Sequence, residues 1–371
     1  FGTGSAGVFT SSGSAGDSTA NTTLTGTAAA TAATVGSGSG FSDGDLILIH
    51  QTQNSGAGAW ELNKISSGAS TTSWTLAYAL TNNYISGAQV YRLIQYSNYT
   101  IGSGHTITAQ SWVQGNLKGG IFVVLASNSI TITGAINAAG NSASGTAPAQ
   151  GIGFMGGPNE EPAGVGSQTG EQGDSSSGAG GNSTAANGAG GGAGHESSGN
   201  AGGGGGGHAI SGGGGFATGG ATPGNGGGTE GNAGLTVMML GAGGGGGAGN
   251  TGSVGGAGGS GGGIVILIAP TITVTGTISV NGGDGGTSAI GGGGGAGGSA
   301  LFKGLTVSLG SNLVTSAAGA QGTSGGVGGY GRIHIDYGAS VSGSNSNPSF
   351  DTRQDSSFLT SGGGGLILSI F

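Results

Sequence analysis

Few side chains in this sequence could do chemistry. Among 371 residues there are 14 Asp and Glu, six Lys and Arg, five His and no Cys. A nucleophile elbow of the form G-x-S-x-G can be written at residues 258–262 and 322–326. A working elbow needs a strand-to-helix turn and triad partners, and no segment has the periodicity of a helix. We therefore expect no catalytic residues and predict that the protein is not an enzyme.

Acidic residues supply the best candidates for a metal site. Glu160, Glu161 and Asp174 cluster with Glu171 near the start of a glycine-rich segment, where carboxylate and backbone oxygens could hold Ca²⁺. Asp284 lies in an N-G-G-D-G turn that is similar to calcium-binding β-roll turns but lacks their nonapeptide repetition. Solvated loop carboxylates are the favoured explanation. We expect no cofactor, and calcium is the one candidate.

Charge and aromatic content limit the partners. The net charge is −8, and nucleic-acid binding needs clustered basic residues that this chain lacks. No run of about 20 apolar residues is present, so no membrane span is expected. The three Trp and five of the seven Tyr lie within residues 41–115. Their rings could stack on surface glycans, although packing in a core is the favoured interpretation.

A short apolar strand that follows a run of glycines recurs along the chain. Glycines precede residues 121–126 and 264–269, and alternating strands follow at 129–138 and 271–280; looser copies start at Gly297 and Gly329. The alternation has a period of two, which is typical of strands with one buried face. Because such a unit cannot bury its apolar face alone, the copies must stack on one another. The pattern predicts a repeat β-sheet or β-helix-like region.

Glycine accounts for 99 of the 371 residues and often recurs at every third position. Period three is the repeat of the polyproline-II conformation. It predicts a polyglycine-II bundle, in which extended segments hydrogen-bond to their neighbours and glycine stands wherever two backbones meet. The alternative is a set of long ordered loops around a β-helix. The candidate lattice residues are Gly243, Gly246, Gly249, Gly252, Gly255, Gly258, Gly261, Gly319, Gly322, Gly325 and Gly328.

Composition divides the chain into four parts. Residues 1–40 are predicted to be a Ser/Thr/Gly-rich extended arm, and residues 41–115 a small antiparallel β-sandwich or barrel. Residues 116–340 hold the strand repeats, with the polyglycine-II segment at about 140–262. Residues 341–371 form a C-terminal tail with a partial repeat. The predicted fold class is all-β, with essentially no α-helix.

These motifs resemble those of bacterial glycine-rich repeat proteins of the cell surface. The resemblance rests on GGGIVILIA, ITVTGTISVNGGDGG and GGVGGYGRIHIDY, and it covers roughly residues 43–338. It implies surface exposure and assembly. The glycine segment also resembles the polyglycine-II tips of phage tail-fibre adhesins and the glycine-rich antifreeze proteins of arthropods. Neither of those patterns includes the strand repeats or the N-terminal β domain.

The last ten residues, GGGGLILSIF, look like the opening of one more repeat without its second strand. Such a strand suits addition to the sheet of a neighbouring molecule. We therefore hypothesise a secreted, extracellular subunit that polymerises with copies of itself into a filament, sheath or surface layer. No signal-peptide pattern opens the chain, so residue 1 is expected to be a processed end. The interface candidates are Val8, Phe9, Leu366, Ile367, Leu368, Ile370 and Phe371.

The alternative is a monomeric or trimeric adhesin, or an ice- or glycan-binding protein. It is favoured by the threonines at 131 and 133 and at 271, 273, 275 and 277, which would form a flat polar face. The same threonines could equally be the solvent side of ordinary strands, because they alternate with the apolar residues.

Overall fold

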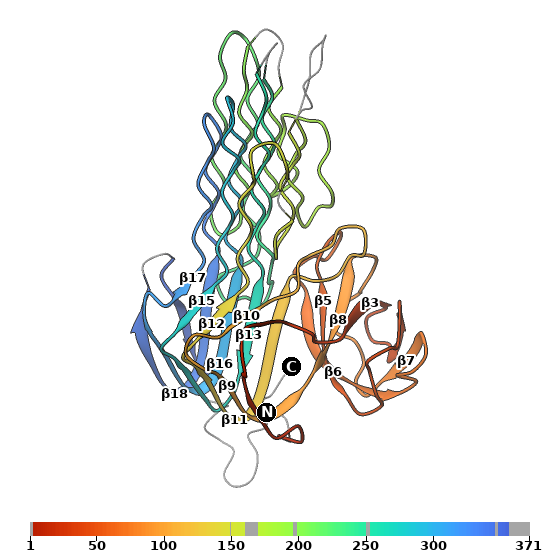
Figure 1. Cartoon of the computed structure of the whole chain (residues 1–371). Helices are drawn as coiled ribbons and strands as arrows, with labels where there is room; N and C mark the ends of the chain where they lie inside the picture. The colour runs from red at the N-terminus through yellow and green to blue at the C-terminus, as the bar shows by residue number, and fades with distance from the viewer. Residues whose placement is uncertain are drawn as a thin grey trace.

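The computed structural model describes residues 3–148, 150–159, 170–195, 199–249, 253–345 and 348–355. Strands and irregular backbone make up these residues, and no helix occurs among them. The predicted all-β class is therefore confirmed. Figure 1 shows a barrel, a stack of strands beside it, and a long bundle of extended chains that rises from the stack.

Six antiparallel strands close the barrel. In their order around it they are β3 (Asn21–Gly26), β4 (Ala32–Val35), β7 (Ser73–Leu76), β6 (Trp60–Ser67), β5 (Leu46–Gln51) and β8 (Ala88–Leu93). Closure leaves no free strand edge. The predicted antiparallel β domain is present, but residue 40 is not its boundary. Leu24 and Val35 are buried in its core, so β3 and β4 belong to the barrel rather than to an extended arm.

A large parallel sheet carries the repeats. Its order is β1 (Val8–Thr10), β9 (Gln95–Ile101), β11 (Ile121–Ile132), β13 (Ile264–Ile268), β16 (Ser299–Ser311), β18 (Arg332–Ser344) and β19 (Asp351–Gln354), with β14 (Thr271–Val274) between β11 and β16. Ile121 lies opposite Ile264, Ile264 opposite Ser299, and Ser299 opposite Arg332. The four sequence copies therefore stack in register, as their shared pattern predicted.

A small parallel sheet covers one face of the large one. Its order is β17 (Val314–Thr315), β15 (Thr277–Ser279), β12 (Ala135–Asn137), β10 (Thr106–Thr108) and β2 (Ala15–Gly16). A continuous apolar core fills the space between the two sheets, with Phe122, Phe302 and Ile335 on the large sheet and Ile136 and Ile278 on the small one. We call this pair of sheets the repeat stack.

The other face of the large sheet packs against the barrel. Leu48 and Tyr91 of the barrel share a buried cluster with Ile264, Ile266 and Leu301 of the sheet. Both faces of β13 are covered, one by the small sheet and the other by the barrel. Its five residues are therefore all apolar and all buried, as is usual for parallel strands.

Backbone hydrogen bonds hold the glycine-rich bundle together. Each residue from 243 to 248 donates its N–H to one of three neighbouring segments, and the cycle repeats every three residues. The bonds run from Gly243 to Asp174, Gly244 to Gly259, Gly245 to Gly204, Gly246 to Glu171, Gly247 to Gly256 and Ala248 to Ala201, with N···O distances of 2.8–3.0 Å. The bundle is therefore ordered by main-chain groups, which are its only abundant bonding groups.

The candidate lattice glycines lie where the backbones meet. Ten of the eleven are buried in the bundle, and Gly252 lies outside the described residues. Glycine is not confined to one position in three, however. A Cβ on Gly244 or Gly245 would also collide with a neighbouring carbonyl oxygen, because an interior segment has neighbours on every side. On the segment 324–330, only Ser324, Val327 and Tyr330 are exposed, and larger side chains stand there.

Candidate functional site

The stack is open at its β1 end. β1 pairs with β9 on one side, and no described strand pairs with its other side. Val8 is 66% exposed, whereas Phe9 turns inward and stacks on Tyr99 with ring centroids 4.5 Å apart. The two N-terminal interface candidates therefore form part of the chain's own sheet, at an edge that no described strand covers.

A cavity of about 160 Å³ lies at this end of the stack. Phe9, Tyr96, Tyr99 and Phe122 line it from the large sheet. β2 and the three polar residues that follow it, at 17–19, line the other side. Its volume is close to that of apolar cavities that take up one benzene-sized group, about 150 Å³. The β1 end therefore offers backbone groups that pair with no described strand and a recess with aromatic and polar walls.

The stack is also open at its β17–β19 end. Leu313, Tyr337, Val341 and Phe350 pack against the core but are only partly buried. All four residues of β19 are exposed. Terminal units of repeat proteins usually cover their core with a polar face, and the described residues do not fully cover either end of this stack.

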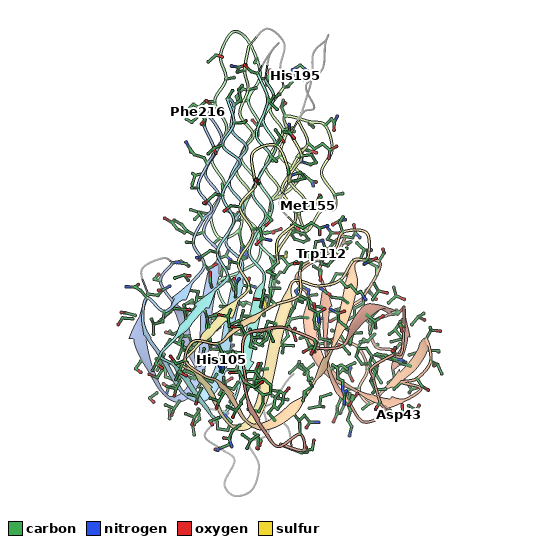
Figure 2. All side chains as sticks on the ribbon, viewed as in Figure 1. Asp43, His105, Trp112, Met155, His195 and Phe216 are labelled. Carbon is green, nitrogen blue, oxygen red and sulfur yellow. The ribbon has the colours of Figure 1, made fainter. Side chains whose placement is uncertain are left out.

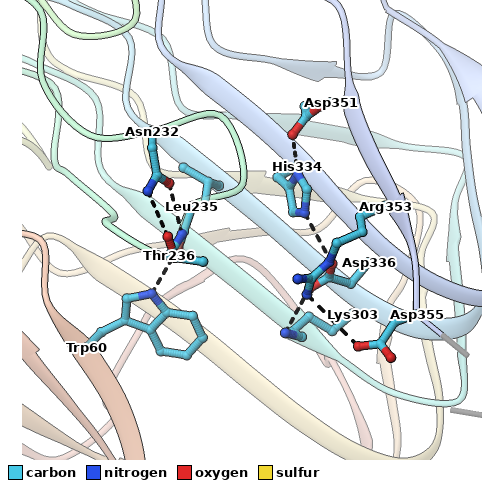
Figure 3. A network of polar contacts seen from close by, with 10 residues as sticks. All are labelled: Trp60, Asn232, Leu235, Thr236, Lys303, His334, Asp336, Asp351, Arg353 and Asp355. Carbon is cyan, nitrogen blue, oxygen red and sulfur yellow. Dashed lines mark hydrogen bonds and ion pairs between the residues drawn. The ribbon is translucent and has the colours of Figure 1, made fainter. Parts of the chain in front are cut away.

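A charged network fastens β19 to the sheet (Figure 3). Asp336 on β18 contacts Lys303 Nζ at 2.7 Å, Arg353 Nε at 2.7 Å and His334 Nε2 at 3.2 Å. His334 Nδ1 lies 2.7 Å from the carboxylate of Asp351. Burial alone would raise the pKa of Asp336, but its hydrogen bonds from His334, Arg353 and Lys303 hold that pKa well below its usual range. Sequence reasoning missed this network, because its members come from three separate strands.

Of the candidate calcium residues, the structure describes Asp174 and Asp284, which have separate partners. Asp174 is buried and accepts the Gly180 N–H at 2.8 Å, whereas Asp284 accepts the Ala320 N–H at 2.7 Å. Glu160 and Glu161 lie outside the described residues. Within the described ranges there is no group of three or more His, Asp or Glu side chains suited to a metal ion. The C-terminal interface candidates, 366–368, 370 and 371, also lie outside those ranges.

The tryptophans serve packing rather than an open platform. Trp74 is buried in the barrel core, and Trp60 donates its indole N–H to Leu235 O at 2.9 Å. Trp112 meets Phe154 edge-on, at 5.6 Å between ring centroids, where the barrel adjoins the foot of the bundle (Figure 2). The barrel does carry a shallow concavity of about 920 Å³ whose lining residues include Thr25, Thr34, Asn82 and Asn83.

Buried ionisable groups lie around the foot of the bundle. Burial lowers the pKa of His50 to about 4, although Met238 O accepts a hydrogen bond from its ring. Burial also lowers the pKa of His208 to about 4. Burial raises the pKa of Glu230 to about 7 and that of Asp174 to about 6. These two pairs make opposite contributions to the pH dependence of folding.

We expect stability to change little between pH 7 and pH 5, because these contributions cancel. The histidines bind protons less readily when folded, so they lose stability as the pH falls from about 6.5 towards 4. Glu230 binds its proton more readily when folded, so it gains stability as the pH falls from about 7 towards 4.5. Urea unfolding should therefore show Glu230→Gln less stable at pH 5 than at pH 7 by about 2 kcal/mol. His50→Asn should shift by a similar amount in the opposite direction; identical pH profiles for the two variants would contradict this assignment.

Comparisons with known proteins assign no family. No protein-family model and no curated protein matches the chain. A tailspike of Acinetobacter baumannii bacteriophage AP22, solved in complex with a capsular saccharide of that bacterium, matches with a TM-score of 0.20 and 12% identity. The match covers 91% of this chain and 58% of the tailspike chain, so this chain spans less than two thirds of that protein. A score this low does not establish a shared fold. Within the described ranges, no helix has the length and apolar character needed to cross a membrane.

Proposed function

We propose that the protein is an extracellular structural subunit that assembles end to end with copies of itself. One observation carries this proposal. The repeat stack is built of parallel strands in register, and at both of its ends the described residues leave strand edges and apolar side chains incompletely covered. The strand edge at one end of a subunit can pair with the strand edge at the opposite end of a second copy. Repetition of this head-to-tail contact generates a filament.

The bundle would act as a stiff projection from each subunit. Its three-way hydrogen bonding, repeated every three residues, supports its assignment as a polyglycine-II lattice. The described glycines of 202–207, 241–247 and 291–298 all lie outside the positive-φ region, which agrees with extended polyproline-like segments. A shaft of this kind needs little apolar core, so it could stand out from an assembly into water.

Sedimentation velocity over a hundredfold range of protein concentration tests the proposal. Head-to-tail association has no closed end point, so the sedimentation coefficient should rise continuously with concentration. A closed dimer or trimer would instead give one limiting value. A single monomeric boundary at every concentration would contradict self-assembly.

A surface adhesin, or a glycan- or ice-binding protein, is the second candidate. It is favoured by a row of hydroxyl groups that crosses the large sheet in register. The row is Thr10, Thr100, Thr131, Thr273, Ser308 and Ser342. Its members lie one strand spacing apart, about 4.8 Å, and all are at least partly exposed.

Binding of the intact protein to insoluble polysaccharides and to ice tests this second candidate. Thr131→Asp and Thr273→Asp place charges in the middle of the row, while Thr75→Asp, at an exposed position of the barrel strand β7, serves as a control elsewhere. Loss of binding in the first two variants alone would support a role for the row. Retention in all three would show that the row is only the solvent side of the sheet.

A further inference from the structure

The β1 end provides a specific receiving site for a strand. We propose that residues 366–371 of a second copy pair in parallel with the free edge of β1 and place an apolar side chain in the cavity beside Phe9. This inference rests on the proposed self-assembly and names its donor and acceptor. It follows from the backbone geometry of β1, the cavity, the repeat sequence and the occupied position beside β18.

The backbone of β1 is ready to pair. The Ser11 N–H donates to Thr100 O at 3.0 Å, and successive N–H groups of a strand point to opposite sides. The N–H groups of Val8 and Thr10 therefore point away from β9. Every other neighbouring pair in this sheet is parallel, so a parallel partner continues the established pattern.

The aromatic wall of the recess suits the side chains of the donor, which would lie opposite the polar wall formed by Asp17, Ser18 and Thr19. In an extended conformation, the sequence LILSIF of residues 366–371 would place Leu366, Leu368 and Ile370 on one face. That face corresponds to the inward face of β1, which holds Phe9. The cavity of about 160 Å³ beside Phe9, Tyr96 and Tyr99 has room for one such side chain. No charged side chain of the donor would be buried, because the run has none.

The corresponding position within the same chain is already taken. In sequence, residues 362–371 match the start of the repeats that form β13 and the first half of β16. The next place in register would be beside β18. There β19 of the same chain pairs with His334–Tyr337, held by the contacts of Arg353 with Asp336 and of Asp351 with His334. The edge of β18 at this level is therefore taken within the chain, whereas no described strand pairs with the outer edge of β1.

Cysteine cross-linking tests the pairing directly, because the chain has no cysteine of its own. One preparation carries Ser369→Cys and the other carries Val8→Cys, and the two are mixed under mild oxidation. A disulfide forms only when the two Cα atoms approach to about 4.4–6.8 Å. The expected result is a covalent dimer of one copy of each variant. In a control mixture, Thr352→Cys on the exposed β19 edge takes the place of Val8→Cys, and this mixture should give little covalent dimer.

A second pair of variants tests the backbone groups of β1. Val8→Pro removes an N–H that makes no bond to β9, so the single subunit should keep its stability while association weakens about tenfold. Val8→Thr keeps the N–H and a β-branched side chain, so it should associate normally. Equal association of the two variants would overturn the edge pairing.

The outcomes separate this inference from the proposed function. Two outcomes would overturn the donor–acceptor assignment and leave self-assembly intact. One is a cross-link between Ser369→Cys and Thr352→Cys. The other is no cross-link at either site in a sample that still sediments as long assemblies. The absence of both cross-links in a sample that remains monomeric would overturn both proposals.

Discussion

Replacing Gly258 with alanine is expected to lower the free energy of unfolding by about 3 kcal/mol or more. A Cβ at this position would lie well under 3.0 Å from the carbonyl oxygen of Gly244, a separation that real Cβ atoms essentially never show. Gly258 also donates its N–H to Gly157 O at 2.8 Å. The methyl group could fit only if two bundle segments moved apart and lost hydrogen bonds. Urea unfolding of the variant measures the effect.

Gly214→Ala is the matched control. Gly214 belongs to the same bundle but is exposed, and the nearest atom to its added Cβ would be Gly224 O at 3.7 Å. Its alanine variant should be unchanged or more stable by up to about 1 kcal/mol, because alanine has less freedom to lose on folding. Equal tolerance of alanine at both positions would mean that the bundle segments are not in backbone contact.

Replacing Asp336 with asparagine is expected to cost roughly 3 kcal/mol. The carboxylate is almost fully buried and contacts Lys303, Arg353 and His334. Asparagine has nearly the same shape but no charge, so both cations lose their partner in a poorly hydrated place. The full cost of an unpaired buried charge is not reached, because Arg353 is more than half exposed and can turn to water. Thermal or urea unfolding gives the loss of stability.

The site of the damage is also predicted. Because Asp336 holds Arg353, the variant should release β19, and amide hydrogen exchange should accelerate in residues 351–354 before it does so in the barrel. Asp355→Asn is the control, since Asp355 is 3.9 Å from Arg353 and more exposed, and it should change stability by less than about 0.5 kcal/mol. An unchanged urea midpoint for Asp336→Asn would show that the network does not stabilise the sheet.

The repeats could be predicted because a short local pattern in the sequence is enough to indicate a strand and its pairing. Glycines followed by an alternating apolar run define both a strand and its buried face. A shared pattern such as Ile130 and Ile132 with Ile272 and Val274 also defines the register. The period of the glycines predicted the bundle for a similar reason. What it missed was the difference between interior segments, in which glycine also stands outside the one position in three, and the exposed segment that carries Val327 and Tyr330.

The barrel boundary and the polar contacts could not be predicted from local pattern. β3 and β4 are mainly Thr, Ala and Asn, and their place in a closed barrel depends on strands as distant as β8. Likewise His50 contacts Met238 O, 188 positions away, and Asp336 gathers partners from β16, β18 and β19. Such contacts form only when distant segments pack together. A single polar residue has no periodicity in the sequence that would indicate its partner.

Electron microscopy of the intact protein at neutral pH tests the central claim most directly, which is that open ends of the repeat stack join one subunit to the next. We predict long filaments of regular width, in which the large sheets of successive subunits follow one another along the axis and the bundles project to the side. Discrete, separate particles at every concentration and in every field would contradict the claim.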